Sequence, residues 1–182
     1  IENERHCSAR TCNQRLAAIH AFIRFVMMEE PHMLLQCQRI IAIPFQKHQY
    51  PEVNYLSGRE IEVILSQTNL TTIHGRRDTT LLCLMYDTGA RVQEMIDLSV
   101  HDIRLDTPAQ VRLTGKGHKS RSVPLTTHTA SMLSAYMEEN GLTHKDYAPV
   151  FTNRQGKRFT RAGVTYILKK NVEKARETLT YL

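Results

Sequence analysis

The residues best suited to chemistry surround Arg91, which follows a Thr88-Gly89 pair and precedes Glu94 by three positions. A glycine at this place favours a helix end followed by a tight turn. The free N–H groups of the next helix then add positive potential beside Arg91. A guanidinium offers a planar fork of donors that matches two oxygens of one phosphate, and it stays charged at any working pH. The pattern therefore indicates a phosphate-binding arginine. The alternative is a surface arginine that only pairs with Glu94.

A second basic stretch follows about 25 residues later along the chain, where the apolar period changes from that of a helix to that of a strand. Alternating residues around a glycine-containing centre predict a β-hairpin over residues 111–125. Lys116 lies between two glycines of this tip, and a lysine can give a proton to a leaving oxygen. Lys119 is the alternative for that role. Lys119 and Arg121 are expected to contact phosphates. A solvated basic tip is the simpler interpretation.

Taken together and in this order, these stretches resemble the tyrosine recombinase (phage integrase) family. The first match is Thr88-Gly-Ala-Arg91 with Glu94, followed by Leu98 and Asp102 at four-residue steps. The second is Gly115-Lys-Gly-His-Lys-Ser-Arg-Ser-Val-Pro-Leu125, which is similar to the family's hairpin motif. A weaker third match spans residues 150–160. Thr-Gly-x-Arg alone is weak evidence, but the two motifs in sequence are strong evidence.

The resemblance implies a function and a role for each motif residue. Arg91 would be the catalytic arginine that contacts the scissile phosphate, Lys116 the hairpin lysine, and Glu94 a support for the local structure. The implied activity is site-specific DNA recombination or integration, by strand cleavage and rejoining through a phosphotyrosyl intermediate. The implied partner is double-stranded DNA, with homo-oligomers of the full-length protein only on DNA. No metal or small-molecule cofactor is expected.

The sequence departs from the family pattern after the hairpin. The family needs a His-x-x-Arg and then a tyrosine nucleophile, and neither is found in the expected order after residue 125. Tyr181 has no preceding His-x-x-Arg, so we interpret it as a chance tyrosine. We therefore expect the first half of a catalytic domain that is inactive alone. Two other hypotheses stay open: a non-catalytic DNA-binding module derived from a recombinase, and a helical interaction protein.

The elements before the linker predict a helical fragment similar to the end of the family's core-binding domain. Residues 8–30 read as one helix, with a Thr11-x-x-Gln14 capping box and an apolar stripe through Leu16, Ile19, Ile23 and Val26. A shorter helix is expected over residues 33–41. The start of the long helix is predicted to face a DNA groove with Arg10, Thr11, Asn13 and Arg15. The alternative is that Thr11 merely caps the helix.

The rest of the chain predicts a mostly α domain with a small antiparallel β-sheet. We expect domains at residues 1–45 and 56–182, joined by a linker at 46–55. Predicted helices follow the Ser57 capping box and cover residues 78–87, 91–98 and 127–140, with a last helix after the Thr160 cap. Tyr86 is expected to face inward, and the apolar positions of the last helix are Val164, Ile167, Leu168, Val172, Ala175 and Leu179.

Composition limits the remaining possibilities. The chain has 182 residues with a net charge of +6, and residues 151–182 hold eight basic and two acidic side chains. This balance suits a polyanionic partner. The basic residues of the last helix, Lys169, Lys170, Lys174 and Arg176, are either a solvated face or phosphate contacts. The longest apolar run has six residues, so no membrane span is expected. Four cysteines without a CxxC pattern favour a reduced, cytoplasmic setting.

Overall fold

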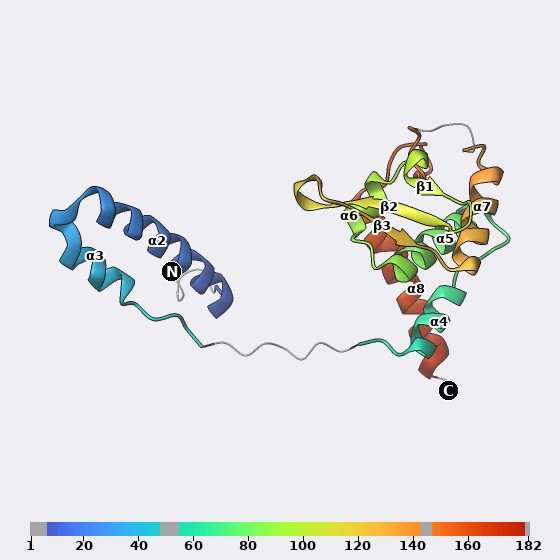
Figure 1. The fold of residues 1–182 in the computed structure, drawn as a ribbon. Coiled ribbons are helices and arrows are strands. Elements are labelled where there is room, and N and C mark those ends of the chain that lie inside the picture. Colours follow the sequence, from blue (N-terminus) through green and yellow to red (C-terminus); the bar gives the residue numbers. More distant parts are fainter. Residues whose placement is uncertain (1–6, 48–54, 143–146, 181–182) are drawn as a thin grey trace. The chain divides into compact units, whose positions relative to one another are not determined.

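The computed structural model describes residues 7–47, 55–142 and 147–180, which form two compact units divided between Tyr55 and Leu56 (Figure 1). The predicted fold class, mostly helical with a small antiparallel sheet, is confirmed. Most of the predicted linker lies outside the described residues, and so does Tyr181.

The described residues of the first unit form a pair of helices joined by a short 3-10 turn. The elements are α2 (Ala9–Glu29), η1 (Pro31–Met33) and α3 (Leu34–Ile41). The long helix begins before the predicted capping box, because the Ser8 side chain accepts a hydrogen bond from the Thr11 N–H at 3.3 Å. Thr11 therefore lies in the first turn, not at the cap. Pro31 follows the end of α2 as expected, since it cannot continue the helix.

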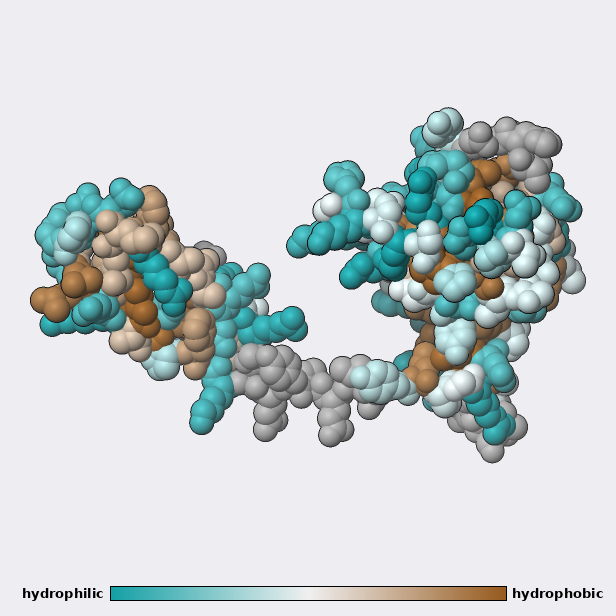
Figure 2. Space-filling view, in the orientation of Figure 1, coloured by the Kyte–Doolittle hydropathy of each residue, from teal (hydrophilic) through white to brown (hydrophobic). Residues whose placement is uncertain are grey.

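The buried side of α2 is not the predicted apolar stripe. His20 is buried, its Nε2 lies 3.1 Å from the Ile40 carbonyl oxygen, and its ring meets Phe45 edge-on. Ile19, by contrast, is exposed. The hydrogen bond to α3 is what makes the interior position acceptable for an imidazole. Figure 2 shows apolar side chains on the surface of this unit.

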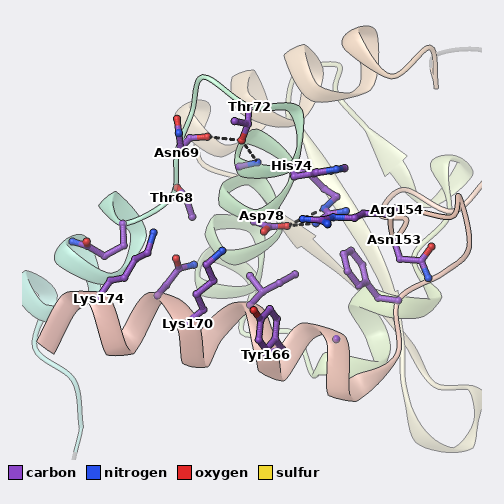
Figure 3. Close-up of a pocket in the computed structure, with 17 residues that line it drawn as sticks. Thr68, Asn69, Thr72, His74, Asp78, Asn153, Arg154, Tyr166, Lys170 and Lys174 are labelled. Atoms are coloured by element: carbon purple, nitrogen blue, oxygen red, sulfur yellow. Dashed lines mark hydrogen bonds and ion pairs between the residues drawn. The ribbon is translucent and has the colours of Figure 1, made fainter. Parts of the chain in front are cut away.

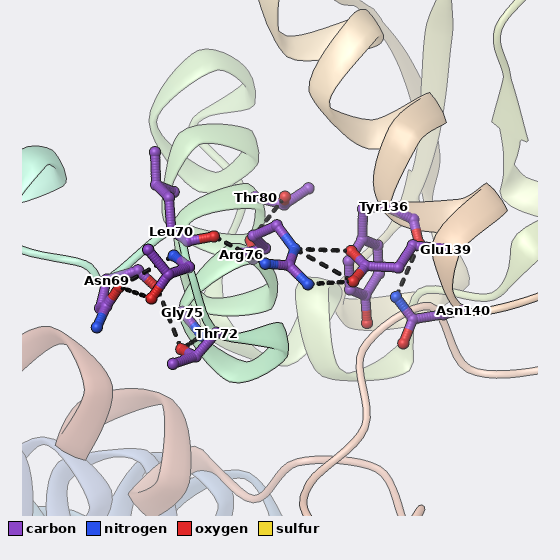
Figure 4. A network of polar contacts seen from close by, with 10 residues as sticks. Asn69, Leu70, Thr72, Gly75, Arg76, Thr80, Tyr136, Glu139 and Asn140 are labelled. Atoms are coloured by element: carbon purple, nitrogen blue, oxygen red, sulfur yellow. Dashed lines mark hydrogen bonds and ion pairs between the residues drawn. The ribbon is translucent and has the colours of Figure 1, made fainter.

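In the described part of the second unit, five α-helices and a small sheet surround one core. Its helices are α4 (Gly58–Ser66), α5 (Ile73–Thr88), α6 (Val92–Asp97), α7 (Thr127–Glu139) and α8 (Arg161–Thr180), with 3-10 turns η2 (Val100–Asp102) and η3 (Lys116–His118). The predicted capping box of α4 is confirmed, because Ser57 and Glu60 exchange side-chain and backbone hydrogen bonds. Arg76 of α5 and Glu139 of α7 form an ion pair that ties these two helices together (Figure 4).

Helix α5 begins five residues before the predicted start at Asp78. Thr72 caps it by accepting from the Gly75 N–H at 3.0 Å, and Gly75 is required because a Cβ there would lie 1.8 Å from the Asn69 carbonyl oxygen. The first turns are polar and show no apolar period, so pattern alone missed them. The helix ends at Gly89, as predicted, with φ of 58°. Tyr86 is exposed, which corrects the prediction that it faces inward.

The sheet has three antiparallel strands in the order β1 (Ile103–Arg104), β2 (Gln110–Thr114) and β3 (Ser120–Pro124). The predicted hairpin is β2 and β3, which pair Leu113 with Arg121 across the ladder. Strand β1 has two residues, too few to show an alternating pattern. Pro124 ends an edge strand, where its missing N–H costs little.

The core of the second unit lies between the sheet and the helices. Leu84, Val111, Leu113 and Leu133 are completely buried. The Tyr136 hydroxyl donates to the Val150 carbonyl at 3.0 Å, and burial raises the pKa of this phenol to about 12. On α8, Val164, Ile167 and Ala175 are buried as predicted, but Leu168 is exposed, because the side of α8 that packs carries Asn171 instead.

Candidate functional site

One buried carboxylate holds two arginines that are 30 residues apart in the chain. The Glu94 side chain is 2% exposed. Arg121 donates from Nη1 to Oε1 at 2.9 Å and from Nη2 to Oε2 at 2.8 Å. Arg91 donates its backbone N–H to Oε2 at 2.8 Å and its Nη1 to Oε1 at 3.1 Å. Glu94 thus joins the start of α6 to strand β3.

The charge of this cluster follows from its hydrogen bonds. The side-chain hydrogen bonds from Arg121 outweigh the cost of burial and, with those from Arg91, lower the pKa of Glu94 to about 2. The same contact raises the pKa of Arg121. Glu94 is therefore ionised at neutral pH, and two guanidiniums share one negative charge. The cluster keeps a surplus positive charge for a ligand.

The base of the hairpin packs directly on this cluster. A Cβ at Gly115 would lie 2.7 Å from Glu94 Oε1 and 3.6 Å from Arg91 Nη1. Only glycine fits between the hairpin and the carboxylate. The Gly115 N–H donates to the Lys119 carbonyl at 2.9 Å, which closes the tip. The backbone thereby brings the hairpin to the side of Arg91.

Arg91 itself is open to solvent, with 74% of its side chain exposed. Only Nη1 of its guanidinium is hydrogen-bonded within the described residues, so Nε and Nη2 can meet a ligand. Lys116 and Lys119 are exposed at the tip, where Gly117 adopts φ of 76°. Neither lysine forms an ion pair or hydrogen bond through its side chain in the described part of the chain. The arrangement can bind a phosphate group at the side of Arg91.

Arg121 directs two of its five N–H donors to Glu94 in this structure. Each of its two terminal nitrogens donates once to Glu94, a partner 27 residues away that local spacing could not reveal. Its phosphate contact stays a prediction, and its observed role is to position the hairpin against α6.

Two further arginines that sequence reasoning missed hold α6 in place. Arg158 donates to the carbonyls of Ile96 and Leu98 at 2.9 and 3.2 Å. Arg161, at the start of α8, donates from Nε to the Gln93 side chain at 2.8 Å. These contacts fix both ends of the helix that carries Arg91 and Glu94. No local pattern marks them, because their partners lie about 60 residues or more away.

The predicted groove residues of the first unit are mostly engaged within that unit. Asn13 exchanges two 2.8 Å hydrogen bonds with the Gln46 backbone. Arg15 donates to the Cys7 sulfur at 3.4 Å, and the Thr11 hydroxyl lies 3.0 Å from that of Ser8. Arg10 is exposed. Their DNA contacts stay predictions.

Two kinds of feature are absent from the residues that the structure describes. No group of three or more His, Cys, Asp or Glu side chains in the described ranges could hold a metal ion. Among the same residues, no helix combines the length and apolar character that crossing a bilayer requires.

Comparison with known proteins gives consistent matches across the chain. Residues 54–180 match the sequence model of the phage integrase family. The Sinorhizobium fredii protein named "Putative integrase/recombinase y4rD" is 32% identical over 96% of this chain and 63% of its own length. Tyrosine recombinase XerC of Bacillus subtilis is 31% identical over 97% of this chain and 58% of its own length. The chain thus spans less than two thirds of these curated relatives.

Solved structures share the fold. The Tn1549 transposon integrase in complex with circular intermediate DNA matches with a TM-score of 0.68 at 15% identity, over 97% of this chain and 61% of that one. The XerH recombinase bound to its difH substrate matches with a TM-score of 0.57 at 22% identity, over 72% of this chain and 41% of that one. With the family model covering most of its length, the chain belongs to the phage integrase family. The resemblance inferred from the two motifs is confirmed.

Proposed function

We propose that this chain forms part of a site-specific DNA recombinase, in which Arg91 binds the phosphate to be cleaved. The observation that carries the proposal is the exposed Arg91 guanidinium, held by buried Glu94 beside the base of the hairpin. Cleavage of a phosphodiester builds negative charge on the non-bridging oxygens. A positioned cation that needs no reorganisation stabilises that charge.

Lys116 is proposed to protonate the leaving 5′ oxygen, with Lys119 as the alternative. Both lie on the tip whose base rests against Glu94, so the tip can reach the phosphate held by Arg91. In this scheme a tyrosine attacks the phosphorus and forms a 3′-phosphotyrosyl bond as the 5′ hydroxyl leaves. The 5′ hydroxyl of a partner strand then reverses the step and releases the tyrosine.

The proposed partner is double-stranded DNA, bound by the second unit and by Arg10, Thr11, Asn13 and Arg15 of the first unit as a core-binding fragment. The relatives named as recombinases and the neighbour solved with DNA support this partner. Homo-oligomers are proposed only on DNA and for the full-length protein.

We propose that the chain alone forms no covalent link with DNA, because its sequence holds no His-x-x-Arg and tyrosine pair after residue 125. The same feature favours the second candidate function, a non-catalytic DNA-binding module. Incubation with nicked duplex substrates separates the possibilities. Absence of an SDS-stable adduct is expected, and an adduct would overturn the proposed inactivity.

Binding to duplex DNA at several salt concentrations tests the role of Arg91 and Lys116. Each phosphate contact contributes about 0.9 to the slope of log affinity against log salt. Arg91→Ala and Lys116→Ala should each reduce the slope by about this amount. Arg104→Ala, which removes an exposed arginine of β1 that donates to the Pro108 carbonyl, is the matched control. Unchanged slopes for both site variants would refute the proposed contacts.

A further inference from the structure

A cleft lined by basic side chains lies in the second unit, on the side of α8 that faces the end of α4 and the start of α5 (Figure 3). The cleft has a volume of about 530 Å³ and extends along α8 from Gly163 to Lys174. The eleven helical steps between these two residues correspond to a length of about 16 Å. Neither Arg91 nor Glu94 lines it, so it is separate from the candidate site described above.

The cleft contains an asparagine whose amide is not engaged by the protein. Asn171 is only 4% exposed as a residue and lines the cleft, and its side chain makes no hydrogen bond with any described residue. No fully buried side-chain nitrogen or oxygen of the described residues lacks a partner, so the amide atoms of Asn171 reach the solvent of the cleft. Lys170 and Lys174 of α8 line the same cleft and reach into the space below α5 (Figure 3). The amide is therefore available to a ligand in the cleft.

Positive charge dominates the lining. Four basic side chains, Arg77, Arg154, Lys170 and Lys174, face one carboxylate, that of Asp78. Asp78 is already bound by Arg77 through a 2.9 Å hydrogen bond from Nε. Lys170, Lys174 and Arg154 form no ion pair with any residue in the described ranges. The free groups are hydrogen-bond donors, so the matching ligand is an anion rich in acceptors.

An exposed aromatic ring completes the site. Tyr166 lines the cleft one helical turn from Lys170, and 67% of its area is exposed. Lysines that follow a phosphate backbone beside an aromatic ring that stacks on bases are the usual combination for single-stranded nucleic acid. A cleft of about 530 Å³ has the size of a small-molecule site. A cleft of this size admits a short stretch of one strand. It is too small for a duplex, because the major groove alone is about 12 Å wide.

We propose that this cleft binds single-stranded DNA, with backbone phosphates on Lys170, Lys174 and Asn171 and a base stacked on Tyr166. The inference rests on the proposed function, because strand cleavage and exchange release a single-stranded segment that must be held. Helix α8 links the two sites, since Arg161 at its start contacts Gln93 next to the Arg91 cluster. A strand released at Arg91 thus has a cationic path along the same helix.

Titration of a fluorescent deca-thymidine oligonucleotide tests the proposal on the whole chain. Each phosphate contact to a single strand contributes about 0.7 to the salt slope, so Lys170→Ala with Lys174→Ala should reduce the slope by about 1.4. Asn171→Leu should weaken binding about tenfold with an unchanged slope, because it removes one hydrogen bond to a charged group. Tyr166→Leu should also weaken binding about tenfold.

Matched controls come from the same unit. Lys169→Ala removes an exposed lysine of α8 outside the cleft, and Tyr86→Leu removes an exposed tyrosine outside it. Both should leave oligonucleotide binding unchanged, with circular dichroism confirming that every variant is folded. An equal loss with Lys169→Ala would show a solvated basic face and overturn the proposal.

Two further results would also overturn it. One is displacement of the oligonucleotide by a poly-glutamate peptide, combined with no effect of Tyr166→Leu, which would assign the cleft to an acidic polypeptide. The other is displacement by inorganic pyrophosphate at equal phosphate concentration, which would assign it to free phosphate. Duplex binding of Arg91→Ala is measured in parallel. If Arg91→Ala leaves duplex binding unchanged while the cleft variants weaken oligonucleotide binding, the proposed function is refuted and the cleft proposal is retained. If only the cleft variants have no effect, the cleft proposal alone is refuted.

Discussion

The two units of this chain differ in how they bury their apolar side chains. In the second unit, sheet and helices enclose one continuous core that includes Leu84, Leu113 and Phe151. In the first, α2 and α3 each bury one residue, His20 and Cys37. Large apolar side chains remain exposed there, namely Ile19, Phe22, Phe25, Met28, Leu34, Leu35, Ile43 and Phe45. An amphipathic pattern thus shows which residues favour burial, but not what covers them.

The sharpest way to break this comparison is to truncate one aromatic residue in each unit. Phe151→Ala should cost about 3–5 kcal/mol, because it leaves a cavity in a packed core. Phe22→Ala should change the free energy of unfolding by less than about 0.5 kcal/mol, since its side chain is already in water. Urea titration followed by circular dichroism measures both. Comparable losses would show that the α2 surface is covered in solution.

Removing the Glu94 charge tests the junction in the second unit. Glu94→Gln should cost about 2 kcal/mol at neutral pH, because the two arginines lose a charged acceptor and are partly solvated. The pKa of this carboxyl is about 2 in the folded chain against 4.5 as its ordinary value. Its stabilisation is therefore complete above about pH 4.5 and is lost as the pH falls towards 2.

The free energies of unfolding of wild type and Glu94→Gln are measured between pH 4.5 and pH 2. The difference between the two free energies should narrow steadily on acidification. A difference that does not change with pH would mean that the carboxylate charge does not stabilise the junction.

Alanine substitutions at two glycines of the hairpin distinguish the effect of a steric clash from the effect of an unfavourable backbone conformation. Gly115→Ala places a methyl group 2.7 Å from Glu94 Oε1 and should cost about 1–3 kcal/mol while displacing the hairpin. Gly117→Ala meets no atom but must adopt φ near 76°, at a cost of about 1 kcal/mol. Duplex DNA binding should fall further with Gly115→Ala. Equal effects on binding would contradict a specific contact between hairpin and carboxylate.

The smallest loss of stability is expected from removing a helix cap in each of the two units. Ser57→Ala removes the hydroxyl half of a capping box and leaves the bond from its backbone N–H to Glu60, and Ser8→Ala removes a single cap, each at about 1 kcal/mol or less. Ser57→Ala should lower the overall melting temperature, because α4 packs on α8 in the second unit. Ser8→Ala should reduce only the helical signal of α2. A reversed order would mean that α2 is coupled to a larger cooperative unit.

Local signals predicted much of the fold, and long-range contacts explain what they missed. The hairpin, the α4 cap and the Gly89 helix end follow from residues within a few positions of each other. The early start of α5 escaped prediction because its first turns are polar and Arg77 is buried against Thr152 and Phe159, about 80 residues away. The burial of His20 was not predicted for a similar reason, since its partner Ile40 lies on another helix.

The candidate site divides in the same way. Arg91, Glu94 and Lys116 could be selected from motif spacing and resemblance. The engagement of Arg121 by Glu94 could not, because it depends on how β3 meets α6. Asn171 carries no sequence signal at all, since only packing makes an ordinary helical asparagine a buried one.

Because Arg91 and Arg121 share one acceptor, substitutions at these two positions should not have independent effects. If either guanidinium is lost, the other can take over the vacated lone pairs of Glu94 and change its own orientation. The energies of the two single variants should therefore not add to that of the double variant. A residue on the hairpin strand would then set how far an arginine on another element extends into the solvent.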